Sequence, residues 1–160
     1  MQIRTATAAD LTAVTQLEAA CFPAAEAASR SSLAQRLAVY PNHFWLLCDG
    51  YQLVSLVNGM VTDEPDLRDE MYEDASLHNE NGAWQMIFGV DTHPDYRCRG
   101  CAGQLLRHVI GQARQQGRKG LVLTCKDRLV HYYAQFGFMN EGVSQSTHGD
   151  VVWYQMRLTF

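Results

Sequence analysis

The chain has 160 residues, a length that suits one domain with a substantial hydrophobic core, and we expect residues 1–160 to form a single domain. A formal net charge of −4 excludes a general electrostatic attraction to nucleic acid. No apolar run is long enough to span a bilayer, and residues 1–9 lack the basic and apolar regions of a signal peptide, so we expect a cytoplasmic chain without membrane contact.

The N-terminal third predicts one strand and two helices. Residues 2–5 alternate weakly between polar and apolar side chains, which predicts a first strand. Apolar residues at helical spacing predict a helix over residues 10–20, and Pro23 follows its end. A second, shorter helix is expected over residues 29–40.

A hairpin and a long acidic connection come next. Asp49-Gly50 stands between apolar runs at residues 44–48 and 51–61, a pattern that predicts two strands joined by a tight turn. Residues 62–81 form a long connection that is rich in carboxylates, with a helical turn expected near Leu67. Two interpretations of this acidity stay open: a solvated loop, or a surface that steers a cationic ligand.

The central segment predicts a buried strand and then a long helix. Residues 84–90 contain few polar side chains, which favours a central fourth strand. The loop over residues 91–99 leads into a helix expected over residues 100–116, which Gly117 ends.

The C-terminal part predicts three strands and one short helix. The strands are expected over residues 121–124, 138–144 and 151–159, and the helix over residues 128–136. The complete order is β-α-α-β-β-β-α-β-α-β-β, which predicts an α/β fold with a mixed sheet and helices on both of its faces.

Cysteine usage argues against disulfides and against a metal. An odd number of cysteines without an export signal does not fit a disulfide framework. Cys98 and Cys101 form a C-x-x-C pair, but a structural zinc site needs about four ligands and only His93 is nearby. We therefore expect no metal.

The most informative segment is the start of the long helix. The first turn of a helix carries unpaired N–H groups and a partial positive charge. Small side chains at Gly100, Ala102 and Gly103 allow a ligand to approach the backbone, and Arg97 and Arg99 add charge that suits phosphate oxygens. This combination predicts a pyrophosphate cradle. The alternative is a tight turn without a ligand.

This segment resembles the acetyl-CoA motif of the GNAT superfamily of N-acetyltransferases. Arg97-x-x-Gly100-x-Ala102 is similar to its Gln/Arg-x-x-Gly-x-Gly/Ala pattern, and residues 132–138 resemble its downstream aromatic-x-x-x-Gly-Phe pattern. The resemblance implies a mostly antiparallel sheet of about seven strands, splayed between strands 4 and 5, and acetyl-CoA as cosubstrate. The residues that it assigns to acetyl-CoA are Phe88, Gly89, Val90, Arg97, Cys98, Arg99, Gly100, Cys101, Ala102 and Gly103.

Within the superfamily, the chain is most similar to the serotonin (arylalkylamine) N-acetyltransferases. Residues 125–138 carry much of this similarity. Those enzymes have two histidines on the fourth strand, at the positions that Trp84 and Met86 occupy here. Trp84 and Met86 are therefore interpreted either as an apolar wall for the acceptor side chain or as core residues, and the route of the amine proton differs from that of the arylalkylamine enzymes.

The resemblance implies direct attack of an amine on the thioester, with backbone N–H groups of Phe88, Gly89 and Val90 stabilising the oxyanion. Tyr133 aligns with the tyrosine that protonates the departing thiolate, the alternative being an aromatic residue packed on the core. His78, Asp127 or ordered water are the candidates for the base that accepts the amine proton.

The sequence thus predicts an acetyl-CoA-dependent acyltransferase acting on a primary amine, with a small (aryl)alkylamine as the expected acceptor. Two alternatives stay open: a protein lysine or N-terminal acetyltransferase, and a non-catalytic acetyl-CoA-binding module. We expect a monomer or homodimer that binds no nucleic acid.

Overall fold

The computed structural model describes residues 1–160, which form two compact units. The first unit contains residues 1–59 and 89–109, and the second contains residues 60–88 and 110–160. The chain passes from one unit to the other after Gly59, after Phe88 and after Val109.

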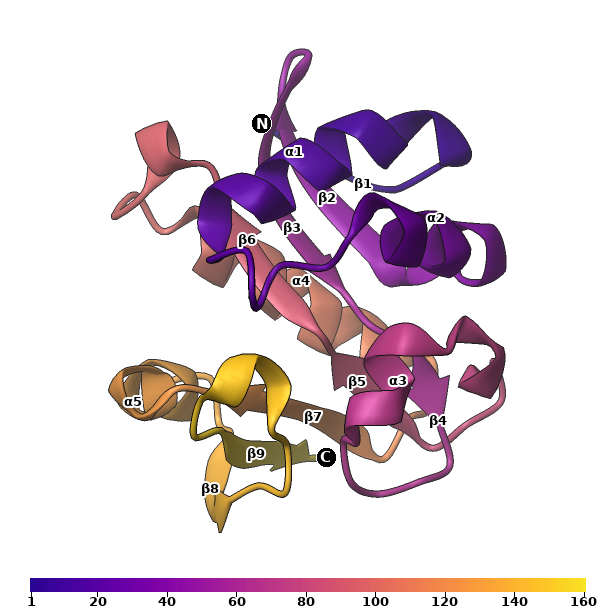
Figure 1. The fold of residues 1–160 in the computed structure, drawn as a ribbon, viewed down its shortest axis with the longest axis vertical. Coiled ribbons are helices and arrows are strands. Elements are labelled where there is room, and N and C mark those ends of the chain that lie inside the picture. Colours follow the sequence, from indigo (N-terminus) through magenta and orange to yellow (C-terminus); the bar gives the residue numbers. More distant parts are fainter. The chain divides into compact units, whose positions relative to one another are not determined.

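The first unit is built on a four-stranded antiparallel sheet with the order β1-β2-β3-β6 (Figure 1). The strands are β1 (Gln2–Thr5), β2 (Phe44–Asp49), β3 (Gln52–Asn58) and β6 (Gly89–Thr92). The predicted hairpin is confirmed: β2 pairs with β3, and Gly50 adopts the positive φ of 58° that such a turn requires.

Helices α1 (Leu11–Cys21) and α2 (Arg30–Val39) pack on each other and cover one face of this sheet (Figure 1). Both were predicted, to within one or two residues at each end. The hydroxyl of Ser29 accepts the N–H of Ser32 at 3.1 Å and caps α2. Four consecutive residues of β2 are fully covered, Phe44, Trp45, Leu46 and Leu47, which is why this central strand is apolar on both faces.

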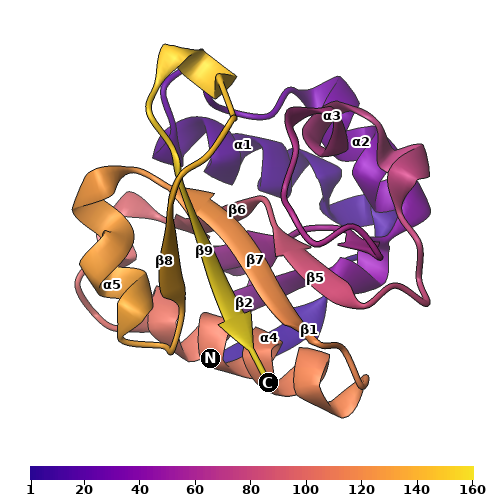
Figure 2. The same cartoon turned by 90° about the horizontal axis from the view of Figure 1, so that it is seen from below.

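The second unit has a five-stranded sheet with the order β4-β5-β7-β9-β8. Figure 2 shows β5, β7, β9 and β8 of this sheet, and β4 is labelled in Figure 1. Its strands are β4 (Val61–Thr62), β5 (Trp84–Ile87), β7 (Gly120–Cys125), β8 (Met139–Val143) and β9 (Tyr154–Thr159). β5 runs parallel to β7, and all other pairings are antiparallel.

The helices of the second unit are short. α3 (Asp69–Glu73) lies in the acidic connection, just beyond the helical turn expected near Leu67. α5 (Val130–Ala134) packs on β8 and β9, and a 3₁₀ turn, η5 (Asp127–Leu129), precedes it. The long helix α4 (Cys101–Gln115) begins in the first unit and ends in the second. None of the helices is both long and apolar enough to cross a membrane.

The predicted fourth strand is interrupted at Phe88. Its first half, β5, pairs with β7 in the second sheet, whereas its second half, β6, pairs with β3 in the first sheet. The expected strand over residues 51–61 divides in the same way into β3 and β4. The mixed α/β, mostly antiparallel architecture is confirmed, but it consists of two sheets, because an apolar run predicts burial without specifying the pairing partner.

Candidate active site

The predicted pyrophosphate loop has an unusual backbone. After the 3₁₀ turn η4 (Pro94–Tyr96), the exposed Cys98 and Gly100 both adopt left-handed conformations, with φ of 61° and 76°. Left-handed residues at such spacing are typical of the concave backbone segments that bind anions. A Cβ atom added to Gly100 would meet no atom within 4 Å, so the space beside its Cα is open.

Helix α4 starts directly after this loop. The N–H of Gln104 donates to the carbonyl of Gly100 at 3.0 Å, which is the first bond of the helical ladder. The N–H groups of Cys101, Ala102 and Gly103 therefore form the first turn, where the helix dipole favours a negative charge.

The two arginines of the motif are held by different neighbours in the first unit. The Arg99 guanidinium lies over the ring of Tyr96, 5.3 Å from its centroid, and the Tyr96 hydroxyl donates to Asp49 at 3.2 Å. Arg97 lies beside the Cys21 thiol and partly offsets the rise in the pKa of Cys21 that burial causes. Both arginines remain exposed, so the loop keeps a positive charge at the surface.

Strand β6, which leads into the loop, is the edge strand of the first sheet. The N–H of His93 donates to the carbonyl of Val54 at 2.8 Å. Because hydrogen-bonded pairs alternate along an antiparallel ladder, Gly89 and Asn58 also form a hydrogen-bonded pair. The N–H of Gly89 is therefore directed at β3, and that of Val90 points to the edge of β6 that no strand of this sheet covers.

Trp84 and Met86 lie on β5 in the second unit. Met86 is completely buried, and Trp84 is half-buried, with the Arg157 guanidinium 4.6 Å from its ring centroid. This burial favours a packing role for Met86 over a contact with an acceptor.

Tyr133 lies on α5 in the same unit and is buried. Its ring packs edge-on against Tyr132 and Phe138, with centroids 5.1 and 6.2 Å away. Nearby in sequence, Cys125 at the end of β7 is buried against Met156, and burial raises the pKa of its thiol to about 11. Cys125 is therefore a protonated thiol at neutral pH.

The two side chains considered as bases have different surroundings. Both ring nitrogens of His78 are engaged: Nδ1 accepts the N–H of Val61 at 3.0 Å, and Nε2 lies 3.1 Å from a Glu80 oxygen. This arrangement gives His78 a structural role. Asp127 is exposed at the start of η5.

The structure reveals a cluster that the sequence analysis missed. The imidazole of His148, in the 3₁₀ turn η6 (His148–Asp150), stacks on the ring of Tyr72 from α3. The Tyr72 hydroxyl lies 3.1 Å from that of Thr124 on β7, and its ring centroid is 4.7 Å from that of Phe88. The indole N–H of Trp153 donates to the carbonyl of His148 at 2.7 Å and fixes the turn. No local pattern links these residues, so only the fold could identify them.

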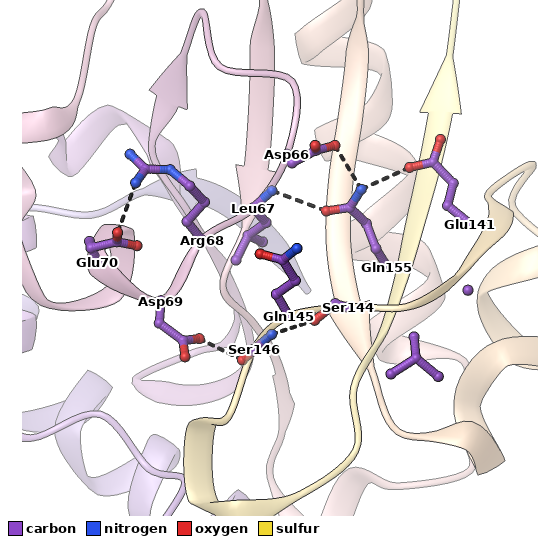
Figure 3. Close-up of a pocket in the computed structure, with 12 residues that line it drawn as sticks. Asp66, Leu67, Arg68, Asp69, Glu70, Glu141, Ser144, Gln145, Ser146 and Gln155 are labelled. Carbon is purple, nitrogen blue, oxygen red and sulfur yellow. Dashed lines mark hydrogen bonds and ion pairs between the residues drawn. The ribbon is translucent and has the colours of Figure 1, made fainter.

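A pocket of about 540 Å³ also lies in the second unit, between the acidic connection and the β8–β9 segment (Figure 3). Gln155 ties its wall together by donating to Asp66 at 2.9 Å and to Glu141 at 2.8 Å. Hydrogen bonds from Arg157 and Gln155 lower the pKa of Glu141. Asp69 accepts the Ser146 hydroxyl at 2.5 Å. Part of the acidic stretch is therefore structural, because it anchors the connection to the C-terminal strands.

The chain matches the model of the acetyltransferase (GNAT) family over residues 11–138. It is 27% identical to a serotonin N-acetyltransferase of Mesocricetus auratus over 124 residues, which cover 72% of this chain and 58% of that relative. The chain thus spans less than two thirds of the curated relative's length.

Solved structures share the fold across the whole chain. One is the GphF GNAT-like decarboxylase in complex with isobutyryl-CoA, with a TM-score of 0.86, 24% identity and 99% of each chain covered. Another is the ribosomal-protein-S18-alanine N-acetyltransferase from Escherichia coli, with a TM-score of 0.74, 17% identity, and coverage of 99% of this chain and 92% of that one.

Proposed function

The chain belongs to the acetyltransferase (GNAT) family, and we propose that it transfers an acetyl group from acetyl-CoA to a primary amine by direct attack on the thioester. One observation carries this proposal: an edge strand, β6, leads within a few residues to an exposed, positively charged loop at a helix N-terminus. An extended ligand arm can pair with the edge strand while its pyrophosphate binds at the helix.

The residues that would hold acetyl-CoA fit its chemistry. The segment from Arg97 to Gly103, which joins the loop to the first turn of α4, offers left-handed backbone, small side chains and two cations for a pyrophosphate. The Val90 N–H, on the open edge of β6, is the donor best directed to stabilise an oxyanion. A donor of this kind typically contributes a few kcal/mol to catalysis.

The acceptor proton needs a base, because an alkylammonium with a lysine-like pKa of about 10.4 is almost fully protonated at neutral pH. We assign this role to His148. Histidine is the side chain that most readily exchanges protons near neutral pH, and the imidazole of His148 stacks on Tyr72, whose ring also packs against Phe88.

Tyr133 is assigned the role of acid for the departing thiolate, on the basis of the family resemblance. A free thiol has a pKa of about 8.5, so this proton transfer is the easier of the two.

For the acceptor we propose a small arylalkylamine. Four half-buried rings, Tyr72, Phe88, His148 and Trp153, gather in the second unit and offer an aromatic surface for an aryl group. The 27% identity to a serotonin N-acetyltransferase supports the same class of substrate. A protein N-terminal or lysine acetyltransferase stays the alternative, since the S18-alanine N-acetyltransferase shares the fold.

A second candidate activity is decarboxylation of a carboxyacyl-CoA, because the GNAT-like decarboxylase matches this fold over its full length. In that reaction the C–C bond to the carboxylate breaks, CO₂ leaves, and the electron pair forms a thioester enolate. The donor on β6 would stabilise this oxyanion, and a proton taken up at carbon would complete the shortened thioester.

The test is a thiol-release assay with acetyl-CoA and tryptamine, phenethylamine, polyamines, amino acids and a lysine peptide, run beside malonyl-CoA with detection of acetyl-CoA formation. Release with one class of amine supports acetyl transfer and identifies the acceptor. Conversion of malonyl-CoA without thiol release supports the decarboxylase instead. Binding of acetyl-CoA without either reaction indicates a non-catalytic module, and absence of binding contradicts the whole proposal.

A further inference from the structure

A pair of neighbouring carboxyl groups in the first unit has buried oxygens without a hydrogen-bond partner. These oxygens are Oε1 of Glu18, on α1, and both Oδ atoms of Asp91, on β6. Asp91 is 0% exposed and Glu18 is 6% exposed, so solvent does not satisfy these atoms. An unpaired ionised carboxylate in such a position is very costly, which requires an explanation.

The two carboxyl groups meet beside Gly89. A Cβ atom added to Gly89 would lie 3.0 Å from Oδ1 of Asp91, 3.4 Å from Nδ2 of Asn58 and 3.6 Å from Oε1 of Glu18. Burial raises the pKa of Asp91 well above its ordinary range, and the charge of the neighbouring Glu18 raises it further. The carboxyl groups are therefore close enough to interact directly.

The charged groups around the pair balance the negative charge of only one of the two carboxylates. Arg36, from α2, is buried, donates to Oδ1 of Asn58 at 3.1 Å and lowers the pKa of Asp91. Cys21, from α1, contributes a neutral thiol that donates to the carbonyl of Thr92 at 3.2 Å and lies beside Arg97. One buried cation facing two carboxylates leaves an excess negative charge, which a single bound proton removes.

We propose that Glu18 and Asp91 share one proton, and that this carboxyl pair is a positioning device that fixes β6 at Gly89. Oε2 of Glu18 accepts the N–H of Ala28 at 2.9 Å, so the pair connects α1, the α1–α2 loop and β6. Gly89 directly precedes Val90, the proposed oxyanion donor. The effect on catalysis rests on the proposed function, whereas the shared proton does not.

The carboxyl pair also determines how the stability of the folded protein changes with pH. The folded protein holds this proton more tightly than the unfolded chain does, so unfolding releases it. Its contribution to stability is complete below the ordinary carboxyl pKa of about 4 and is lost as the pH rises through the raised pKa of Asp91. When both groups ionise, repulsion separates α1 from β6.

The test uses the full chain and two conservative variants. Asp91→Asn and Glu18→Gln each replace the shared proton by an amide that donates to the remaining carboxylate, so neither variant loses a proton from the pair as the pH rises. Asp95→Asn, at an exposed aspartate whose side chain is 85% accessible, is the control. The measurement is the infrared C=O stretch of a protonated carboxyl group at neutral pH.

We expect the wild type and Asp95→Asn to show this band, and Asp91→Asn and Glu18→Gln each to lose it. Both variants are also expected to move the alkaline loss of thermal stability, and of kcat where transfer is observed, to higher pH. A wild type without the band, or a band that survives both substitutions, overturns the shared proton. If no acetyl transfer occurs but the band behaves as expected, the proposed function fails and the carboxyl pair stands. If the band behaves as expected but kcat keeps its pH profile, the positioning role fails.

Discussion

The imidazole of His148 stacks on the phenol ring of Tyr72, with centroids 5.3 Å apart and ring planes 13° from parallel. Because Tyr72 also contacts Phe88 and approaches the Thr124 hydroxyl, this stack is anchored to two further residues of the second unit. His148 is the side chain that we propose as the base.

Replacing His148 tests this role. We expect His148→Gln to lower kcat by on the order of 10²-fold, the lower end of the usual effect of a general base. His131→Gln changes an exposed histidine on α5 and is expected to leave kcat unaltered. Steady-state kinetics across pH make the comparison. An unaltered kcat in His148→Gln would remove His148 from the mechanism.

Tyr133 is tested by removal of its hydroxyl alone. Tyr133→Phe keeps the packing against Tyr132 and Phe138, so we expect a normal melting temperature and normal acetyl-CoA affinity. Loss of the proton donor is expected to lower kcat by about 10²-fold. The matched control is Tyr132→Phe, one position earlier. If both variants turn over like the wild type, Tyr133 is only a packing residue.

The substitution Gly100→Ala tests two features of this residue: the open space beside its Cα and its left-handed backbone. In Gly100→Ala, the left-handed φ of 76° is expected to cost about 1–2 kcal/mol, and the new methyl group occupies the proposed ligand space. The KM for acetyl-CoA should rise about tenfold, which corresponds to about 1.4 kcal/mol of binding free energy.

Gly111→Ala, on an exposed face of the same helix, is the control. It is expected to stabilise the protein by up to about 1 kcal/mol without changing KM. Calorimetry and acetyl-CoA titrations measure both effects. A normal KM in Gly100→Ala would contradict the placement of the ligand.

The different exposure of the cysteines predicts which of them an alkylating reagent modifies. The thiolate is the reactive form, and the Cys125 thiol with its pKa of about 11 loses its proton only as the pH approaches that value. At pH 8 we expect iodoacetamide to modify the exposed Cys98 and to spare Cys125 until the chain is unfolded.

Acetyl-CoA is also expected to protect Cys98, which lies in the proposed pyrophosphate loop. Peptide mass mapping measures the rates at which Cys98 and Cys125 are alkylated, with and without acetyl-CoA. Modification of Cys125 in the folded protein as fast as that of Cys98 would contradict its burial.

Much of the fold was predictable because local signals control it. Asp49-Gly50 defines the hairpin, and Gly117 ends α4 with a φ of 78°. The start of α4 was also predictable, since the small residues and the arginines that mark it are contiguous in the sequence.

The remainder depends on tertiary structure. The continuous apolar run around Phe88 does not reveal that the strand changes its pairing partner there. Tyr72 and His148 lie in segments without periodicity and meet only in the fold. Asp91 follows an apolar strand and was assigned to a loop, whereas its carboxyl group is completely buried.

The interruption at Phe88 limits how the length of this segment can vary. Side chains alternate between the two faces of a strand, so inserting or deleting one residue there would turn β6 over while β5 kept its register. Asp91 would then change places with a neighbour such as Val90, which would move a charge out of the buried cluster and an apolar group into it. Inserting or deleting two residues would return each side chain of β6 to its original face of the sheet. Tolerance to insertions at this joint should therefore depend on whether the number of added residues is odd or even.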